Sequence, residues 1–354
     1  TVVTNGASDL HLKPGLKPIM RLHSQIVETD FEPLTPEDLT NIVTDILPPH
    51  VAKIFHDHHE TDFSFFRKGV GRFRVNVFMS EGIPCFAFRH VKGQIPTFEE
   101  LHLPTSLAML AESARGIILL SGTTGSGKST TLASMVQYIN LTSRYRIITI
   151  EDPIEYIFDD HQSVISQREV GLDTENFNAA LKHILRQDPD VIVIGEMRDE
   201  RSFKAALAAA ETGHLVFSTL HAGTASAAIQ RILQFFPAEE WDQARLALAT
   251  NLQSIICQRL MRGAQGGVYP AVEILINTPT VKKLLEKNQL EVIAAAIETG
   301  NEDGMQTFNQ AIYKLIRGGM ITEEEGMAYA TNPAALRMNL QGIFLDEGRR
   351  ILGS

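Results

Sequence analysis

The stretch GTTGSGKST, Gly122 to Thr130, decides how the rest of the chain is interpreted. Gly122, Gly127, Lys128 and Ser129 satisfy the P-loop spacing G-x-x-x-x-G-K-[ST]. In this motif the glycines let successive backbone N–H groups turn toward phosphate oxygens, which lie at the positive end of the following helix. The lysine reaches the β and γ phosphates, and the serine hydroxyl completes the coordination of Mg²⁺. The predicted nucleotide-phosphate site consists of Gly122, Thr123, Thr124, Gly125, Ser126, Gly127, Lys128, Ser129 and Thr130.

The residues on both sides of the motif supply the context that a P-loop needs. An apolar run, GIILLS (116–121), precedes it and predicts a buried strand. After the motif, Leu132, Met135, Val136 and Ile139 follow the i, i+3, i+4, i+7 spacing of an amphipathic helix. A chance turn rich in glycine and serine has no reason to be flanked in this way, so the phosphate-binding interpretation is preferred.

The wider pattern predicts an α/β core with further parts on either side. Three short apolar runs, RIITIED, DVIVIGE and HLVFSTLH, alternate with helical segments, which is typical of a mostly parallel sheet covered by helices. Residues 115–277 are assigned to this core, and the pattern after Pro237 is mainly helical. Residues 1–95 are predicted to form an N-terminal domain, 96–114 a linker, and 278–354 a helical C-terminal region.

Composition limits the classes of function. A chain of 354 residues exceeds what one hydrophobic core usually organises, so two domains are expected. The net charge of −10 disfavours a protein that mainly wraps nucleic acid. Cys85 and Cys257 lack CxxC spacing, which excludes a cysteine-rich zinc module and fits a reducing compartment. No apolar run reaches the ~20 residues of a membrane-spanning helix and no signal-peptide pattern is present, so we expect a soluble cytoplasmic protein.

Acidic residues follow two of the apolar runs, where a P-loop enzyme needs carboxylates for magnesium and water. Glu196 ends VIVIGE in a Walker-B-like position; Gly195 stands where an Asp commonly holds the metal, so Glu196 carries that role alone or shares it. ITIEDPIEY supplies Glu151, Asp152 and Glu155 after a strand that we expect to neighbour the P-loop strand. These three are candidates for positioning the attacking water, and the alternative is that they are solvated acids that cap a helix.

Two histidines, His214 and His221, bracket the apolar run HLVFSTL. Seven residues apart on a strand, they would face opposite sides of the sheet, so a shared metal is not expected. For each of them a functional role and a structural hydrogen-bonding role stay equally open.

A pair of arginines is predicted to face each other in the N-terminal domain. In GRFRVNVF apolar residues alternate with polar ones, as in a half-buried strand. A turn centred on Glu81–Gly82 would place Arg74 directly opposite Arg89 on the next strand. Facing like charges destabilise a sheet unless an anion or a carboxylate lies between them.

Four motifs, taken in order, resemble those of the secretion-type ATPases of type IV pili. They are GTTGSGKSTTLA (Walker A), ITIEDPIEY (aspartate box), DPDVIVIGEMRD (atypical Walker B) and AAETGHLVFSTLHAGTA (histidine box). The similarity extends over nearly the whole chain through five further stretches: QREVGLDTENF, SDLHL, GRFRVNVF, FFPAEE and GMQTFNQAIY.

Within that superfamily the chain is similar to the PilT/PilU retraction branch. Extension-type members often carry a tetracysteine zinc insert and a long extra N-terminal domain, whereas this sequence has two cysteines and about a hundred residues before the predicted core. TVKKLLEK (280–287) is degenerate where PilT proteins typically carry AIRNLIRE, and the tail from Asn332 is longer than expected for PilT. Both features favour the PilU type.

The resemblance implies a PAS-like α+β domain joined to a RecA-like core, with ATP and Mg²⁺ as ligands and six chains in a ring. It places the ring at the cytoplasmic face of the inner membrane, on the pilus platform protein, with a PilT or PilU paralogue as a further partner. By motif, Glu155 is the general base, and Glu196, together with Ser129, serves the magnesium ion. The other implied roles are sensing of the nucleotide state by His214 and His221, and neutralisation of phosphate charge by Arg74 and Arg89.

The expected function is therefore ATP hydrolysis that drives pilus retraction by pilin disassembly, and hence twitching motility. An extension or type II secretion ATPase is the alternative from the same superfamily. A nucleic-acid motor is disfavoured by the acidic net charge and by the lack of interleaved aromatic and basic residues. A nucleotide-binding adaptor with little turnover of its own is the third alternative.

Overall fold

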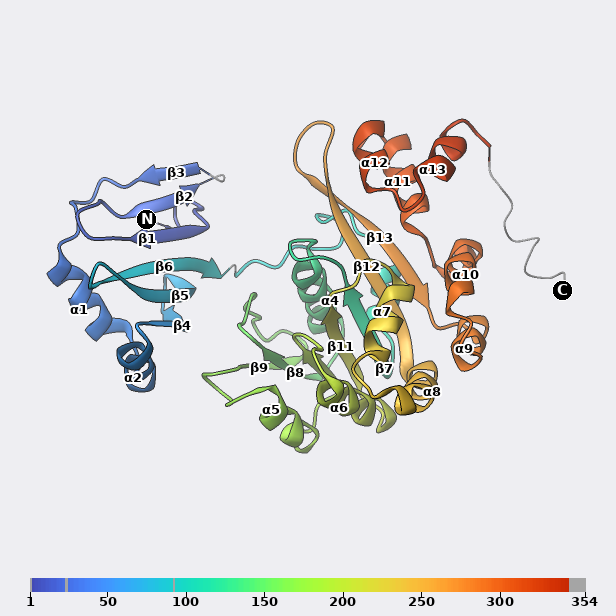
Figure 1. Cartoon of the computed structure of the whole chain (residues 1–354), viewed down its shortest axis with the longest axis horizontal. Coiled ribbons are helices and arrows are strands. Elements are labelled where there is room, and N and C mark those ends of the chain that lie inside the picture. The colour runs from blue at the N-terminus through green and yellow to red at the C-terminus, as the bar shows by residue number, and fades with distance from the viewer. Residues whose placement is uncertain (1, 23–24, 92, 344–354) are drawn as a thin grey trace. The chain divides into compact units, whose positions relative to one another are not determined.

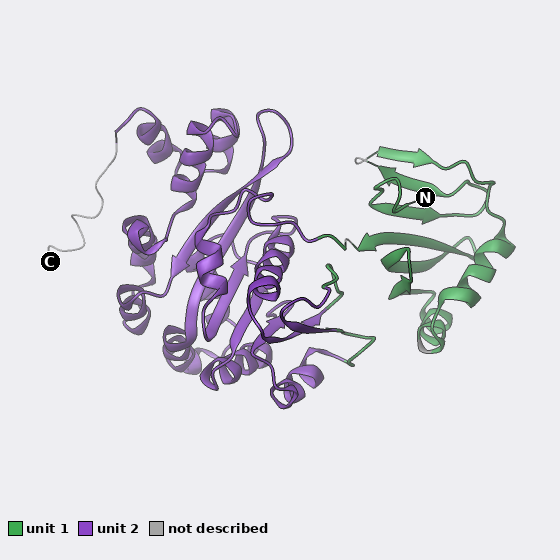
Figure 2. Ribbon diagram, turned by 180° about the vertical axis from the view of Figure 1, so that it is seen from behind, with its two compact units in different colours: residues 1–94, 152–158, 168–175 green, residues 95–151, 159–167, 176–354 purple. Residues whose placement is uncertain are grey.

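The computed structural model describes residues 2–22, 25–91 and 93–343 of the chain, so residues 344–354 of the predicted C-terminal region lie outside it. The chain divides into two compact units (Figure 2). Unit 1 consists of residues 1–94, 152–158 and 168–175, and unit 2 of residues 95–151, 159–167 and 176–354. Two short segments from beyond the P-loop therefore belong to the N-terminal unit, a feature that the sequence did not reveal.

Unit 1 is a six-stranded antiparallel sheet with two helices (Figure 1), in the strand order β3-β2-β1-β6-β5-β4. Its core includes the fully buried side chains of Leu39, Val75, Val77 and Phe86. Its elements are β1 (Asp9–Leu12), β2 (Ile19–Leu22), β3 (Gln25–Glu28), α1 (Pro36–Ile46), α2 (Pro49–His58), β4 (Glu60–Arg67), β5 (Gly71–Ser80) and β6 (Ile83–Val91).

The predicted hairpin between β5 and β6 is confirmed. Glu81 and Gly82 form the two-residue turn with φ of 55° and 78°, the positive values that a type I′ hairpin requires. Ser80 pairs with Ile83, and this register places Arg74 opposite Arg89.

Unit 2 contains a seven-stranded sheet in the order β13-β12-β7-β11-β10-β8-β9 (Figure 1). β7, β11, β10 and β8 are mutually parallel, and β12 runs parallel to β7, so the predicted α/β core is confirmed. The strands are β7 (Gly116–Ser121), β8 (Arg146–Glu151), β9 (Val164–Glu169), β10 (Val191–Ile194), β11 (Leu215–Leu220), β12 (Leu252–Arg262) and β13 (Val268–Ile276).

The helices of unit 2 include the predicted amphipathic helix after the P-loop, in which Leu132, Met135, Val136 and Ile139 are all buried. The segment predicted as a linker contains α3, in which Leu107 is fully buried. The helices are α3 (Ser106–Ala111), α4 (Lys128–Thr142), α5 (Phe177–Ile184), α6 (Glu200–Glu211), α7 (Ala225–Leu233), α8 (Trp241–Asn251), α9 (Pro279–Glu286), α10 (Ile293–Thr299), α11 (Phe308–Arg317), α12 (Glu323–Tyr329) and α13 (Pro333–Leu340).

One expectation about this unit was incomplete and another was wrong. Helices predominate after Pro237 as expected, but β12 and β13 also form a long antiparallel hairpin that extends the sheet beyond β7. Gln258 and Glu273 are buried polar residues of these strands, and they interrupt the apolar pattern that would have marked the strands as buried. The expectation that the strand ending at Glu151 neighbours the P-loop strand was wrong, because β10 and β11 lie between β8 and β7.

None of the described helices has both the length and the apolar character needed to cross a bilayer.

Candidate active site

The strand pairing of unit 2 brings several predicted residues to one edge of the sheet. Ser121 at the end of β7 pairs with Leu220 at the end of β11, and Ile194 at the end of β10 pairs with Ser218 and Ile150. Because carboxyl ends of parallel strands share an edge, the residues that directly follow them do so as well. The residues placed along this edge are Gly122, Glu151, Gly195, Glu196 and His221.

The glycines of the P-loop are required by its backbone and by the close approach of β12. Gly122 and Gly127 have φ of 148° and 86°, in the region that residues with a Cβ rarely adopt. A Cβ on Gly122 would lie 2.6 Å from the carbonyl oxygen of Gln258, and one on Gly127 would lie 2.6 Å from Nε2 of the same residue. A Cβ on Gly122 would thus collide with the backbone of β12, whereas one on Gly127 would displace the side chain of Gln258.

The loop and the start of α4 form a cradle suited to an anion. Lys128 is buried, and its Nζ donates to the carbonyl oxygens of Gly122 (2.8 Å) and Thr123 (3.0 Å). The N-cap of α4, Gly127, makes no side-chain cap bond, and the first turn of the helix contains no acid. The start of a helix attracts anions, so the residues present fit a nucleotide phosphate.

A residue that the sequence did not single out, Gln258 of β12, holds the P-loop in place. Its Oε1 accepts a hydrogen bond from Thr131 Oγ1 at 2.8 Å in the first turn of α4, and both side chains are buried. Its Nε2 lies against Gly127. The residue was missed because its segment was assigned to a helical region, which hid its pairing beside β7.

We expect Gln258→Leu to weaken nucleotide binding while the fold is kept. The substitution leaves the buried Thr131 hydroxyl without its acceptor, at a cost of about 1–3 kcal/mol. If the strain falls on the loop, the Kd for a fluorescent ATP analogue rises by about tenfold. Gln253→Leu is the matched control, since Gln253 lies on the same strand beside Gly116 at the opposite edge of the sheet. Equal Kd values for the two variants would contradict a role for Gln258 in shaping the loop.

Glu196 and His221 contact each other at the edge of the sheet from which the P-loop begins. Glu196 Oε1 lies 3.4 Å from His221 Nε2, and its Oε2 accepts from Arg198 Nε at 2.8 Å. Two hydrogen bonds between the segment after β10 and the end of β11 fix this position, from Met197 N to Thr219 O (3.0 Å) and from Thr219 Oγ1 to Gly195 O (2.7 Å). The carboxylate is a quarter exposed, so it is open to a ligand.

His214 lies at the other end of β11 and is separated from His221 by the whole strand. Its Nδ1 is 2.9 Å from the carbonyl oxygen of Ala209 and 3.1 Å from Thr212 Oγ1. These contacts close the turn between α6 and β11. The structure therefore groups His221, but not His214, with Glu196.

The aspartate-box carboxylates are divided between the two units. Glu151 Oε1 accepts hydrogen bonds from Thr149 Oγ1 (2.6 Å) and Gln167 Nε2 (3.0 Å), all within unit 2. Asp152 and Glu155 follow in a segment that belongs to unit 1, and both are exposed. Of the three candidates, Glu151 is thus engaged in contacts that stabilise the end of the sheet.

The segment that carries Glu155 is held by a buried ion pair that was not predicted. The backbone N–H of Ile154 donates to Glu169 Oε2 at 3.0 Å, and the same oxygen accepts from a terminal nitrogen of Arg72 at 2.8 Å. The side chains of Arg72 and Glu169 are 14% and 5% exposed. They are 97 residues apart in the sequence, so no local pattern could have joined them.

Arg74 and Arg89 face each other as predicted, and each has a carboxylate beside it. Arg89 Nε donates to Asp9 Oδ1 at 2.8 Å, and Arg74 Nε lies 3.9 Å from Asp62 Oδ1. Burial works against the charged form of Asp9, but hydrogen bonds from Ser8 and Arg89 hold the pKa of this carboxyl below its usual value. The facing like charges are therefore compensated, and the arginine side chains, 48% and 70% exposed, are open to further anions.

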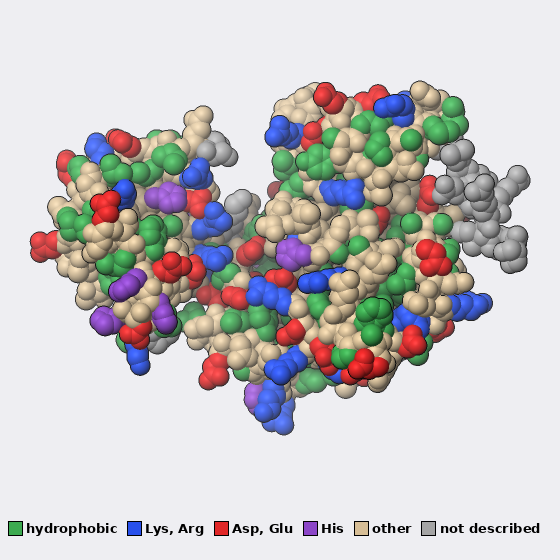
Figure 3. Space-filling model, viewed as in Figure 1, with side chains coloured by type: hydrophobic (Ala, Val, Ile, Leu, Met, Phe, Trp, Pro, Cys, Tyr) green, Lys and Arg blue, Asp and Glu red, His purple; other side chains and the backbone are tan. Residues whose placement is uncertain are grey.

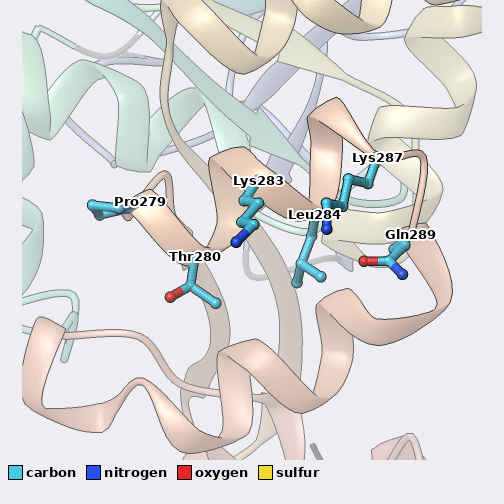
Figure 4. Close-up of a pocket in the computed structure, with 6 residues that line it drawn as sticks. All are labelled: Pro279, Thr280, Lys283, Leu284, Lys287 and Gln289. Atoms are coloured by element: carbon cyan, nitrogen blue, oxygen red, sulfur yellow. The ribbon is translucent and has the colours of Figure 1, made fainter. Parts of the chain in front are cut away.

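A shallow pocket of about 370 Å³ lies on unit 2 away from these residues (Figure 4). It is lined by Pro279, Thr280, Lys283, Leu284, Lys287 and Gln289. It lies around α9, which follows β13 at the edge of the sheet opposite the P-loop. It is therefore separate from the nucleotide cradle, and it coincides with the segment that distinguishes the sequence from the PilT pattern.

Comparison with known proteins agrees with this geometry. The family model for type II/IV secretion system proteins matches residues 97–324. Two Pseudomonas aeruginosa proteins are similar along most of the chain: the type IV pilus ATPase PilU, 40% identical over 341 residues (96% of this chain, 89% of PilU), and the type IV pilus retraction ATPase PilT, 42% identical over 328 residues (93% and 95%). These nearly equal identities do not separate the two types.

The crystal structure of the pilus retraction motor PilT with bound ADP superposes with a TM-score of 0.88 at 44% sequence identity. The match covers 94% of this chain and 96% of that chain. The α/β core, the antiparallel N-terminal sheet and the C-terminal helices are thus shared features. The chain belongs to the type II/IV secretion system protein family and, within it, to the PilT/PilU group of pilus ATPases.

Proposed function

We propose that this protein hydrolyses ATP and uses the energy to drive type IV pilus retraction. The observation that carries the proposal is the meeting of a P-loop with Glu196 and His221 along one edge of a parallel sheet. Similarity to PilT and PilU over more than nine-tenths of the chain supports the pilus as the system concerned.

Binding of the nucleotide is assigned to the P-loop cradle. The loop N–H groups and the start of α4 bind the phosphates, and Lys128 exchanges its bonds to loop carbonyls for the β and γ phosphates. Ser129 and Glu196 would hold Mg²⁺, and their hydroxyl and carboxylate oxygens are ligands that this ion prefers. The bound ion supplies charge neutralisation at the phosphates.

Roles in hydrolysis are assigned to Glu155, Arg74, Arg89, His214 and His221. The exposed carboxylate of Glu155 is suited to accept a proton from the attacking water. Arg74 and Arg89 are suited to stabilise the negative charge that spreads over the transferred phosphate. His221 contacts Glu196 and can respond to what that carboxylate binds, whereas His214 would act as a sensor through the turn that it closes.

The partners and the location follow from the proposed system. Six copies would form a ring on the cytoplasmic side of the inner membrane, bound to the platform protein of the pilus. A PilT or PilU paralogue is the expected further partner. The similarity to both PilT and PilU supports this assignment.

A strain that lacks this gene distinguishes retraction from extension. Loss of a retraction motor leaves pili assembled but not withdrawn, so we expect more surface pili and no twitching. Electron microscopy and a twitching assay check this, and a strain expressing the intact gene from a plasmid is the control. A strain without surface pili would instead support an extension ATPase.

A nucleic-acid motor has less support. On the face seen in Figure 3, Lys and Arg side chains are interspersed with Asp and Glu rather than gathered into a basic surface. The net charge of −10 also opposes binding to a polyanion.

A further inference from the structure

We propose that Arg72 and Glu169 are positioning residues for ATP hydrolysis, because they fasten the segment that carries Glu155 to the arginine-bearing strand β5. The inference rests on the proposed function, since it assigns a task to the segment of the general base. Neither residue belongs to the P-loop or to the group formed by Glu196, His221 and Arg198.

Hydrogen bonds of the turn after β9 hold Glu169 in a fixed position. Its backbone N–H donates to Asp173 Oδ2 at 2.8 Å, and its carbonyl oxygen accepts from the N–H groups of Leu172, Asp173 and Thr174 at 3.3, 2.8 and 3.3 Å. These bonds close the turn after β9 tightly around Glu169. Its side chain is 5% exposed, so it has little freedom to turn away from its partners.

The side chain of Glu169 also holds the backbone next to Glu155 through a hydrogen bond. The carboxylate accepts the N–H of Ile154, whose own side chain is 3% exposed. Glu155 follows directly and is exposed. A firmly held backbone followed by an exposed carboxylate is the arrangement that a general base needs, because its geometry decides the rate of proton transfer.

Arg72 connects Glu169 to β5 through the ion pair. A buried carboxylate needs a cation, and the guanidinium of Arg72 supplies it at 2.8 Å to the same oxygen that accepts from Ile154. Side chains two residues apart on a strand share a face, so Arg72 and Arg74 lie on one face of β5. The ion pair thus ties the Glu155 segment to the strand that presents Arg74, and the two are expected to move as one body.

The test is a set of steady-state and single-turnover ATPase measurements on the full chain. Glu169→Gln keeps an oxygen that can accept from Ile154 but loses the ionic partner of Arg72. We expect kcat to fall by about 10–100-fold. The KM for ATP should stay within about threefold, since the P-loop is not touched.

Arg72→Gln should likewise lower kcat and leave the KM for ATP nearly unchanged, and Arg72→Lys should recover most of the activity. Arg67→Gln, at an exposed arginine of the same sheet, is the matched control and should not change kcat.

A double-mutant cycle with Glu155→Gln decides whether the pair acts through the base. If it does, adding Glu169→Gln to Glu155→Gln lowers kcat further by less than about twofold. A full multiplication of the two losses, or unchanged kcat in both Glu169→Gln and Arg72→Gln, would overturn the inference. Thermal unfolding and binding of a fluorescent ATP analogue verify that each variant is folded, and if Glu169→Gln is not, the Arg72 variants carry the test. Glu155→Gln alone tests the proposed function separately. A loss of kcat smaller than tenfold in this variant would remove Glu155 from the role of base, whatever the double-mutant cycle shows.

Discussion

Arg89→Ala and Arg74→Ala are each expected to reduce ATP turnover by about 10³–10⁵-fold, the loss that follows removal of an arginine acting on a transferred phosphoryl group. Binding of ATP should be largely kept, because the cradle is formed by Lys128 and the loop of unit 2. Phosphate release measured beside the Kd of a fluorescent ATP analogue separates the two effects. The side chain of Arg89 is 70% exposed, so its guanidinium is accessible to an anion although it also pairs with Asp9.

The control for Arg89 is Asp9→Asn, which breaks the same ion pair from its other side. If Arg89 matters only as the partner of Asp9, both variants lose activity alike. If it acts on phosphate, Asp9→Asn stays within a few-fold of the wild type, since a partly exposed ion pair contributes little by itself. Normal turnover in both arginine variants would refute their assignment.

The second large effect is expected for Glu155→Gln, which keeps the shape of the side chain but removes the proton acceptor. Loss of a general base typically slows a reaction by about 10²–10⁴-fold. Single-turnover hydrolysis of radiolabelled ATP measures rates this slow. Asp159→Asn, an exposed carboxylate four residues further on, is the matched control and should be close to wild type. A loss below about tenfold for Glu155→Gln would remove Glu155 from the role of base.

Much of the fold could be predicted because its signals are local. The P-loop spacing, the apolar strand before it and the buried stripe of α4 lie within about two dozen consecutive residues, and each depends only on near neighbours. The β5–β6 hairpin was equally accessible, since a two-residue turn fixes the register and hence the Arg74–Arg89 pair. Features of this kind need no knowledge of the remainder of the chain.

What the sequence could not supply was the order of strands and the contacts between distant segments. The crossover after α4 carries the chain past two positions that β10 and β11 later fill, so β8 does not lie beside β7. Gln258 reaches Thr131 across 127 residues, and Arg72 reaches Glu169 across 97. Such contacts are set by tertiary packing, and the polar residues that make them look like ordinary surface residues in the sequence.

Hydrolysis of ATP at this P-loop is tested by measuring the release of phosphate from Mg²⁺-ATP by the purified protein and by its Lys128→Ala variant. We expect steady, magnesium-dependent release by the wild type and release near the uncatalysed background by the variant, whose P-loop has lost its only lysine. Equal rates from both proteins, or background release from both, would contradict the claim that this P-loop binds ATP for hydrolysis.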